Sequence, residues 1–468
     1  EFKPVEIQSY VFLAIELKQE LYTRAELAQV TRAVNRVFDM PAMLLFKYGE
    51  SLTLAIIDRR LNKRDESRDV LEKVTLIRDV QFAEPHRGHL EILFDLSLES
   101  LRERYGFSNF AELHGAWRKT LDSSELNKRF FREIADWYFW AAKHVTFPEG
   151  AGEHEESRNA TSVIRLITRL IFIWFIKEKG LVPAALFDEA KLHHILNYSD
   201  PKGSTYYKAI LQNLFFATLD QEMNASDKPE RRKFRSRNKR EDGRDPHFNI
   251  TNLYRYEEYF LNPSQALDLF SGVPFLNGGL FECLDKPNKT DPSKVVRIDG
   301  FSDRKDNALS VPDFLFFSRE RDVDLNDSYG TKKKRYEVRG LIHIFNRYKF
   351  TVNENTPIEE EVALDPELLG KVFENLLATY NPETGVTARK QTGSFYTPRE
   401  IVNYMVDESL VAYLSAQLKA RIAALRNMDS LAGVLREVFA YTEKGHPFSE
   451  DEVNVLVDAI DNVKVLDP

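Results

Sequence analysis

Apolar residues recur at helical spacing over most of the chain, from residue 85 to about residue 390. Leu90 and Leu93 belong to one such stripe, and Phe130 and Ile134 belong to another. Each stripe has to be covered by apolar partners, so the pattern predicts a large helical region with a shared core. The longest apolar run, residues 163–176, contains two arginines and is too short and too charged to span a bilayer, so no membrane association is expected.

Residues 10–57, which precede this region, have a different pattern of apolar residues. Residues 10–18 are rich in strand-forming types, with Glu16 and Lys18 on one face and the neighbouring leucine and isoleucine side chains on the other. A helix is predicted over residues 23–38, because Thr23 and Glu26 have the spacing of a capping box. Two further apolar runs, 43–46 and 52–57, flank a turn and predict a hairpin, so the N-terminal unit is of the α/β type.

Charge and cysteine content limit the functional classes. The 468 residues include 65 Lys and Arg against 73 Asp and Glu, a net charge of -8, which excludes a uniformly cationic nucleic-acid binder. The single cysteine excludes internal disulfides and multi-thiolate metal sites, and it fits a reducing, cytoplasmic location. The N-terminus has no secretory signal pattern and no initiator Met, so we expect the front of the chain to be cut.

Two basic clusters interrupt the acidic background, at residues 231–240 and 332–335. Their side chains can neutralise the phosphates of double-stranded DNA, the contact that dominates DNA affinity. A solvated loop without a partner is the alternative. The candidate DNA-binding residues are Arg231, Arg232, Lys233, Arg235, Arg237, Lys239, Arg240, Lys332, Lys333 and Lys334.

A glycine-containing block precedes an amphipathic helix near the C-terminus. In residues 392–400, Thr397 can cap that helix and Pro398 fits its first turn. Gly393 permits close approach of a ligand, and the helix N-terminus offers free amides to a carboxylate. An ordinary capped helix is the alternative. The final residues, 463–468, read as a strand that ends in Asp-Pro, as the first strand of a doubly wound nucleotide-type domain does.

Several of these blocks agree in order with one family. Residues 369–377, 392–398 and 466–468 together resemble the entry to the methyltransferase domain of DNA adenine-N6 methyltransferases. The resemblance is greatest to type IIG restriction-modification enzymes and related phage-defence methylases. Residues 137–140, 165–172 and 274–281 support the same match in the helical part, so the resemblance covers most of the chain.

This resemblance implies a fold and a cofactor. The fold would be mixed α and α/β: a nuclease-like α/β domain in residues 1–83, a helical connector in 84–364, and the start of a Rossmann-like methyltransferase domain in 365–468. The glycine-rich continuation and the Asn/Asp-Pro-Pro-Tyr/Phe motif of the family are missing, so the rest of the methyltransferase domain and the target-recognition region are expected elsewhere. The residues implied to hold S-adenosylmethionine are Gly393, Phe395, Tyr396, Thr397, Pro398 and Asp467.

The N-terminal strand suggests a second chemistry. Glu16-Leu17-Lys18 is similar to the Glu-x-Lys half of PD-(D/E)xK nucleases, which type IIG enzymes often carry before the connector. A carboxylate and an ammonium on one face can hold Mg²⁺ and orient a water beside a phosphate. Glu6 is the available second acid for the metal, and Gln29 on the next helix is expected to assist. The alternative is an exposed Glu/Lys edge of a structural domain.

The sequence therefore predicts the N-terminal part of a bifunctional restriction-modification enzyme that acts in defence against foreign DNA. It would methylate N6 of a flipped adenine from S-adenosylmethionine and cleave DNA with Mg²⁺. The alternative class is a non-catalytic DNA-binding or scaffolding module of a phage-defence system. A Glu16 side chain that points into solvent, away from other carboxylates, would favour that alternative.

Overall fold

The computed structural model describes most of the chain, in fourteen separate stretches. They are residues 11–38, 42–60, 71–198, 203–223, 232–235, 252–276, 279–291, 294–304, 307–353, 355–356, 358–368, 370, 399–439 and 446–465.

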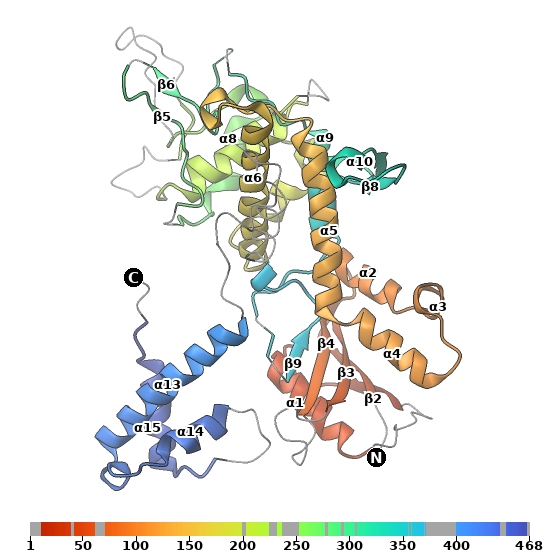
Figure 1. The fold of residues 1–468 in the computed structure, drawn as a ribbon, viewed down its shortest axis with the longest axis vertical. Helices are drawn as coiled ribbons and strands as arrows, with labels where there is room; N and C mark the ends of the chain where they lie inside the picture. The colour runs from red at the N-terminus through yellow and green to blue at the C-terminus, as the bar shows by residue number, and fades with distance from the viewer. Residues whose placement is uncertain are drawn as a thin grey trace.

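A five-stranded mixed sheet lies in the N-terminal part of the molecule (Figure 1), in the strand order β1-β2-β3-β4-β9. β1 runs parallel to β2 and is connected to it through helix α1 (Arg24–Asn35). β2, β3 and β4 are antiparallel neighbours, and β9 then pairs parallel to β4. The strands are β1 (Val11–Glu16), β2 (Ala42–Tyr48), β3 (Ser51–Arg60), β4 (Leu71–Gln81) and β9 (Glu359–Glu361).

Local sequence signals explain α1 and the β2–β3 hairpin. Thr23 caps α1, and Glu26 completes the predicted capping box by accepting a hydrogen bond from the Thr23 backbone N–H at 2.7 Å. The hairpin is also confirmed, because Tyr48 pairs with Ser51 across a two-residue turn. Gly49 in that turn has φ 48°, the left-handed conformation that such tight hairpin turns favour.

Helices cover both faces of the sheet. Leu27 and Ala28 of α1 pack on one face, in a core that contains Leu44 and Phe46 of β2. The opposite face meets the helices that follow the sheet, where the rings of Phe12 on β1 and Trp117 on α4 (Phe110–Thr120) are in edge contact. The even-numbered side chains of β1 therefore point away from α1, as the alternation in the sequence predicted.

The structure adds two strands that the sequence analysis did not anticipate, β4 and β9. The α/β unit predicted to end at residue 83 is completed by a strand from residues 359–361, at the far end of the predicted connector. Mixed α and α/β organisation is found in outline, whereas the likeness to a PD-(D/E)xK or a Rossmann-like domain stays a prediction.

The remaining described elements are mainly helices. The longer helices between the sheet and residue 271 are α2 (Arg87–Asp95), α3 (Leu98–Tyr105), α4, α5 (Ser123–Ala142), α6 (Glu155–Glu178) and α8 (Pro263–Ser271). Two π-helical stretches, η3 (Tyr206–Gln212) and η4 (Phe215–Leu219), lie buried among them. The short elements are η1 (Glu149–Ala151), η2 (Ala184–Phe187), α7 (Glu189–Leu192), η5 (Glu257–Tyr259), β5 (Lys286–Pro287), β6 (Val295–Val296), α9 (Phe314–Phe317), β7 (Arg321–Val323), α10 (Asn326–Tyr329), β8 (Tyr336–Val338) and α11 (Leu341–Asn346).

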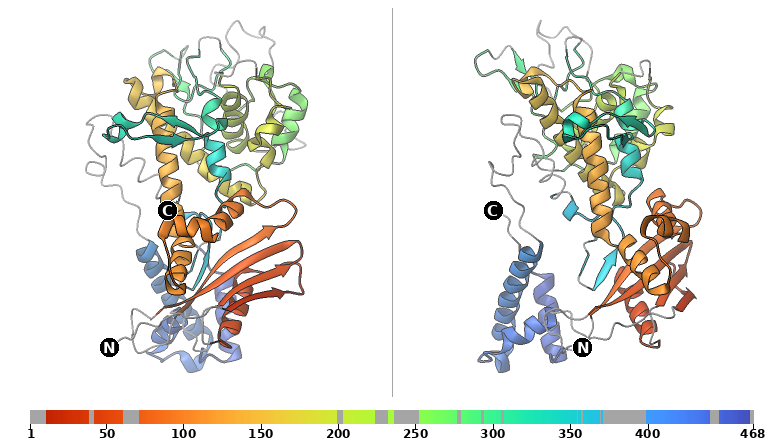
Figure 2. Two further views of the ribbon diagram at one scale, coloured as in Figure 1. Left: turned by 90° about the vertical axis from the view of Figure 1, so that its right-hand side faces the viewer. Right: turned by 45° about the vertical axis from the view of Figure 1, so that its right-hand side comes forward.

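One apolar core joins the helical region to the sheet. α5 runs from the sheet into the helical region, as Figure 2 shows from two further sides. Trp137 of α5 and Trp174 of α6 are fully buried, and their cluster extends to Ile56 and Ile77 on the sheet. Because burial of apolar side chains is the main favourable term in folding, this shared core holds the two parts together.

α6 is longer than the apolar run that the sequence analysis identified. By length and composition it is a helix that can cross a membrane, but 72% of its most apolar window is buried inside the protein. Core helices of soluble proteins pass the same test, so this single helix is weak evidence for a membrane span.

The C-terminal described residues form a helical group with a core of its own. α14 (Leu431–Phe439) and α15 (Glu450–Asp461) pack on α13 (Arg399–Arg421), around Leu414 and Leu418. The short helix η7 (Ala423–Leu425) joins α13 to α14. Residues 463–465 of the predicted final strand are not in a strand, and residues 466–468 lie outside the described residues.

Gly340 provides a test of how tightly the helical region is packed. A Cβ atom there would overlap the carbonyl oxygen of Phe316, whereas one at Gly115 in α4 would meet nothing within 4 Å. We expect Gly340→Ala to lower the free energy of unfolding by about 2 kcal/mol or more, through overpacking. Gly115→Ala should instead raise it by about 0.5–1 kcal/mol, because glycine is unfavourable inside a helix. Urea unfolding of the two variants measures both changes; equal effects would contradict the packing described here.

Candidate nuclease strand and nucleic-acid interface

The Glu-x-Lys motif lies at the end of β1, on the sheet face opposite α1. Glu16 is the last residue of the strand, and Lys18 follows it with an exposed side chain. The Glu16 Oε1 atom lies 3.0 Å from the Nζ atom of Lys47 on β2, and the Glu16 side chain is 76% exposed. An exposed ion pair of this kind contributes little to stability.

Gln29 does not join this site. It is an exposed residue of α1, whose buried side packs on the odd-numbered side chains of β1. Glu16 belongs to the even-numbered set on the other face, so the sheet separates the two side chains. The expectation that Gln29 assists Glu16 and Lys18 is therefore corrected.

A magnesium site on β1 requires a second acid. Glu6, the candidate, lies outside the described residues. Within the part of the chain that the structure describes, no group of three or more His, Cys, Asp and Glu side chains could hold a metal ion. Glu16 alone does not make a magnesium site, because Mg²⁺ requires several oxygen ligands.

The second basic cluster forms an exposed turn between α10 and β8. Lys332, Lys333 and Lys334 are all exposed, and no ion pair between described residues includes any of them. The two ends of the turn are held together by stacked rings: Tyr336 of β8 stacks on Tyr329 of α10, with ring centroids 5.0 Å apart. The turn therefore presents Lys332 and Lys333 to solvent, while the Lys334 Nζ atom lies 4.7 Å from the centroid of the Tyr336 ring.

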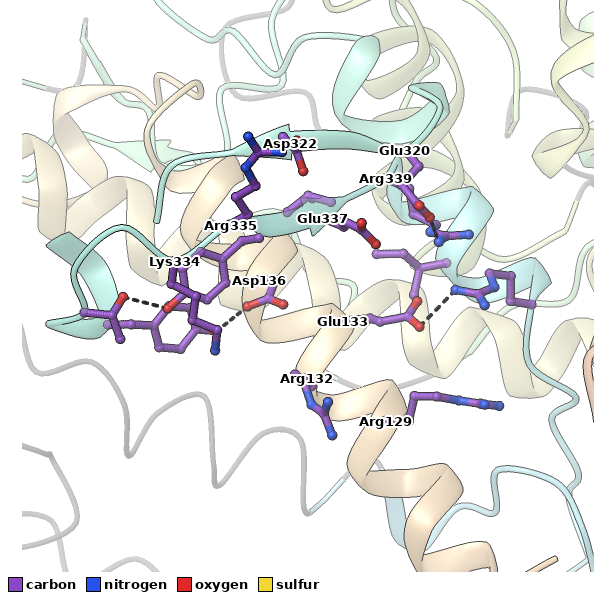
Figure 3. Close-up of a pocket in the computed structure, with 16 residues that line it drawn as sticks. Arg129, Arg132, Glu133, Asp136, Glu320, Asp322, Lys334, Arg335, Glu337 and Arg339 are labelled. Atoms are coloured by element: carbon purple, nitrogen blue, oxygen red, sulfur yellow. Dashed lines mark hydrogen bonds and ion pairs between the residues drawn. The ribbon is translucent and has the colours of Figure 1, made fainter. Parts of the chain in front are cut away.

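A charged pocket of about 740 Å³ lies beside this turn, between α5 and the β7–β8 hairpin (Figure 3). Tyr329 and Asp136 both line the pocket, and the Tyr329 hydroxyl donates a hydrogen bond to Asp136 Oδ1 at 2.6 Å. Burial raises the pKa of Asp136, although Lys334 and Arg132 lie near it. The pocket is lined by Arg129, Arg132, Glu133, Asp136, Glu320, Asp322, Tyr329, Thr331, Lys334, Arg335, Tyr336, Glu337, Val338, Arg339, Ile344 and Arg347.

Most charges in the pocket already have partners. Arg347 binds Glu133 at 3.0 Å, Arg335 lies 3.6 Å from Asp322, and Arg339 pairs with Glu320. Arg132, on the exposed side of α5, forms no ion pair with another described residue. Together with Lys334 it adds positive charge to the pocket, a feature that the sequence analysis missed because Arg132 lies outside the two basic clusters.

The first basic cluster behaves differently where it is described. Arg232 is only 6% exposed, and its guanidinium donates to the carbonyl oxygens of Val273 (2.5 Å), Thr218 (2.8 Å) and Gln221 (2.9 Å). These carbonyls lie at the C-terminal ends of η4 and α8, where a cation is favoured. Burial lowers the pKa of Arg232. The DNA-binding role expected for Arg232 is therefore corrected, because a buried side chain cannot reach a phosphate.

Arg235 is also engaged within the protein. Its NH1 atom lies 2.5 Å from Asp303 Oδ1, and its side chain is 13% exposed. Lys233 is exposed and compatible with a phosphate contact. The other predicted members of this cluster, Arg231, Arg237, Lys239 and Arg240, lie outside the described residues.

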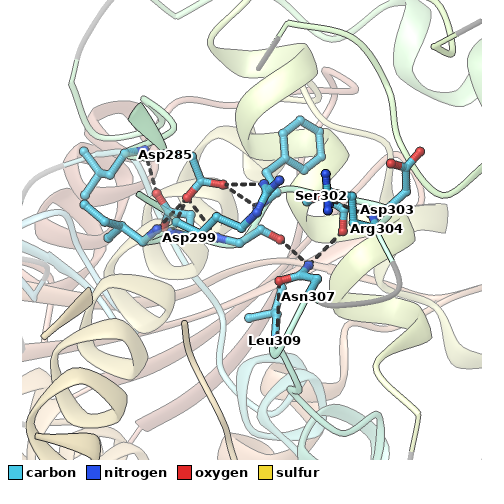
Figure 4. A network of polar contacts seen from close by, with 12 residues as sticks. Asp285, Asp299, Ser302, Asp303, Arg304, Asn307 and Leu309 are labelled. Carbon is cyan, nitrogen blue, oxygen red and sulfur yellow. Dashed lines mark hydrogen bonds and ion pairs between the residues drawn. The ribbon is translucent and has the colours of Figure 1, made fainter. Parts of the chain in front are cut away.

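Asp303 belongs to a polar network that supports this segment (Figure 4). Asp299 pairs with Arg169 at 3.1 Å and with Arg165 at 3.4 Å, so the two arginines of α6 bind a buried acid rather than a phosphate. Asp285 accepts hydrogen bonds from four consecutive backbone N–H groups, those of residues 298–301, at 2.6–3.0 Å. The network fixes the loop that carries Asp303.

The residues implied to hold S-adenosylmethionine lie outside the described residues. They are Gly393, Phe395, Tyr396, Thr397, Pro398 and Asp467. The helix predicted to follow the Gly-Ser-Phe-Tyr-Thr-Pro block is present as α13, which begins at Arg399.

Comparison with known proteins gives one relative. The chain is 26% identical over 332 residues to a protein of Methanocaldococcus jannaschii that is named as a putative type II restriction enzyme and methyltransferase. The match covers 69% of this chain and 20% of the relative, so the chain spans about a fifth of that protein's length. No family model and no solved structure matches the chain. The similarity supports a restriction-modification type of enzyme at the coarse level.

Arg232 offers a test of the corrected assignment. Arg232→Met should lower the free energy of unfolding by about 3 kcal/mol, because buried carbonyl groups lose their donor. Lys233→Met, next in the sequence but exposed, should change it by less than about 0.5 kcal/mol. Urea unfolding measures both. A stable Arg232→Met protein with weakened DNA binding would restore the original DNA-contact role.

Proposed function

We propose that this chain is the N-terminal part of a cytoplasmic restriction-modification enzyme that methylates N6 of adenine in double-stranded DNA and cleaves foreign DNA. The observation that carries the proposal is the similarity over 332 residues to a relative named for both activities. The resemblance of residues 369–377 and 392–398 to type IIG methyltransferases supports the adenine-N6 chemistry. S-adenosylmethionine would supply the methyl group.

For the cleavage activity, Glu16 and Lys18 remain the candidates on the N-terminal sheet. Glu16 ends β1 and Lys18 lies in the bend that follows, and both side chains are exposed to an approaching DNA strand. Glu16 and Glu6 would together bind Mg²⁺ in this proposal. Lys18 would orient the phosphate by its positive charge.

A non-catalytic scaffolding role for the N-terminal domain is the second candidate. It is favoured by the position of Glu16, which is exposed and paired with Lys47. In that case the domain would contribute DNA binding or spacing, and methylation would be the only chemistry of the complete protein.

Two assays on the full-length native protein separate these possibilities. Incubation with DNA and isotope-labelled S-adenosylmethionine should give labelled N6-methyladenine, identified by nucleoside mass spectrometry. With Mg²⁺, cleavage should occur and should fall by about 100-fold or more in Lys18→Ala, because a positioned catalytic group is lost. Lys128→Ala, which removes an exposed lysine of α5 away from β1, is the matched control and should cleave normally. Methylation without cleavage would favour the scaffold, and the absence of methylated adenine would reject the enzyme class.

We propose that the lysine turn, residues 332–334, and Arg132 contact the DNA backbone. Lys334 of the turn and Arg132 of α5 both line the pocket. Lys332, Lys333 and Arg132 form no ion pair with another described residue, and exposed cations of this kind release counterions when they bind phosphates, which is the source of salt-dependent affinity.

Charge reversal tests this surface. The double variant Lys332→Glu with Lys333→Glu should weaken DNA binding and reduce the slope of log affinity against log salt by about 2, since each phosphate contact contributes about one. Lys191→Glu with Lys294→Glu is the matched control, with the same change in net charge at exposed lysines elsewhere. Fluorescence anisotropy at several salt concentrations gives both slopes. Equal slopes for the two double variants would reject the lysine turn as a contact.

A further inference from the structure

β9 consists of three consecutive glutamates, Glu359, Glu360 and Glu361, that pack inside the protein. Glu360 is 5% exposed and Glu361 is 4% exposed. Burial of a carboxylate costs several kcal/mol unless partners compensate it, and neighbouring like charges add repulsion. A strand of this composition therefore depends on the cations around it.

The first two carboxylates are held by different elements of the N-terminal part. Glu359 lies 3.5 Å from Arg24 and 3.6 Å from Arg32, both on α1. Glu360 pairs with Lys73 of β4 and accepts a hydrogen bond at 3.1 Å from the backbone N–H of Ser123, the first residue of α5. A helix N-terminus favours an anion, so Glu360 joins three elements at one point.

Of the three glutamates, Glu361 has the weakest polar contacts. Its Oε2 atom accepts a hydrogen bond of 3.4 Å from the Thr351 hydroxyl. No ion pair within 4 Å between described residues includes it, and burial raises the pKa of Glu361 although Arg78 and Lys349 lie near. Its buried carboxylate opposes docking rather than favouring it.

The backbone pairing between β9 and β4 is short. β9 is in register only with Val74, Thr75 and Leu76 of β4, whereas β3 and β4 share nine residue pairs. The Val74 N–H donates to Ile358 O and the Val362 N–H donates to Leu76 O, both at 2.9 Å. Without β9 this stretch of β4 would be an open edge, ready to accept another strand.

We propose that this edge of β4, with its fringe of Arg24, Arg32 and Lys73, is a docking site for an acidic extended strand that β9 occupies reversibly. Docking ties the N-terminal sheet to the chain that continues from residue 365. If the proposed function holds, that continuation leads to the methyl-donor region, and β9 is the link by which the two activities are coupled.

Hydrogen exchange on the whole protein tests the docking. Raising salt from about 0.1 M to about 1 M screens the ion pairs, so the Val74 and Val362 amides should exchange about tenfold faster, while the β2–β3 amides should not change. Lys73→Glu should have the same local effect at low salt and should remove most of the salt response. Lys128→Glu, which reverses an exposed lysine of α5 paired with Glu125, is the matched control and should leave β9 unchanged.

A labelled peptide with the sequence of residues 355–364 distinguishes a docking site from a fixed strand. The peptide should bind to the Glu360→Lys protein at low salt, because the native strand of that protein is repelled and leaves the edge of β4 open. It should bind only weakly to the Lys128→Glu control at high salt. The same peptide with glutamines in place of its three glutamates should bind at least about tenfold more weakly. Two outcomes would overturn the proposal, whether or not the protein methylates DNA. The first is that the Val74 and Val362 amides exchange at rates that change together with those of the β2–β3 amides under all conditions. The second is that the two peptides bind equally well.

Discussion

Buried charges in this protein are paired across long stretches of sequence, and its architecture depends on those pairs. Arg169 on α6 meets Asp299, and Glu360 on β9 meets Lys73 on β4. Removal of one partner would leave the other buried and unpaired, which costs far more than an exposed pair contributes. Each pair therefore fixes how two elements sit together, in addition to the apolar core that the sheet and the helices share. In the docked state, the return of the chain to the N-terminal sheet as β9 is the clearest case.

The parts of the fold that could be predicted from sequence are those determined by residues close together in the chain. The capping box of Thr23 and Glu26, the turn at Gly49 and the alternation along β1 are each complete within a few positions. β9 could not be predicted in this way. Three adjacent glutamates are typical of a solvated surface, and their burial depends on cations that come from α1 and β4. No local sequence pattern indicates that these cations lie next to the glutamates in the fold.

The two basic clusters make the same point about the candidate site. Both were interpreted as phosphate contacts from composition. Arg232 turns inward because the ends of η4 and α8 converge there and leave carbonyl groups that require a donor. Lys332 and Lys333 stay exposed in the turn that joins the stacked rings of Tyr329 and Tyr336. Whether a cation faces solvent is decided by what lies next to it in space, and a run of like charges in sequence does not contain that information.

The nuclease interpretation depends on the edge of the sheet that β1 forms. In the described part of the chain β1 is an edge strand, since only β2 pairs with it. On the β2 side, the position beside Glu16 is filled by Lys47, a cation that neutralises the carboxylate rather than sharing a metal with it. In the proposed site, the second acid would be supplied by a strand added at the open edge of β1, in a register that directs its side chain away from α1. A strand displaced by one residue would direct that acid to the α1 face, so cleavage chemistry here depends on register as much as on the presence of Glu6.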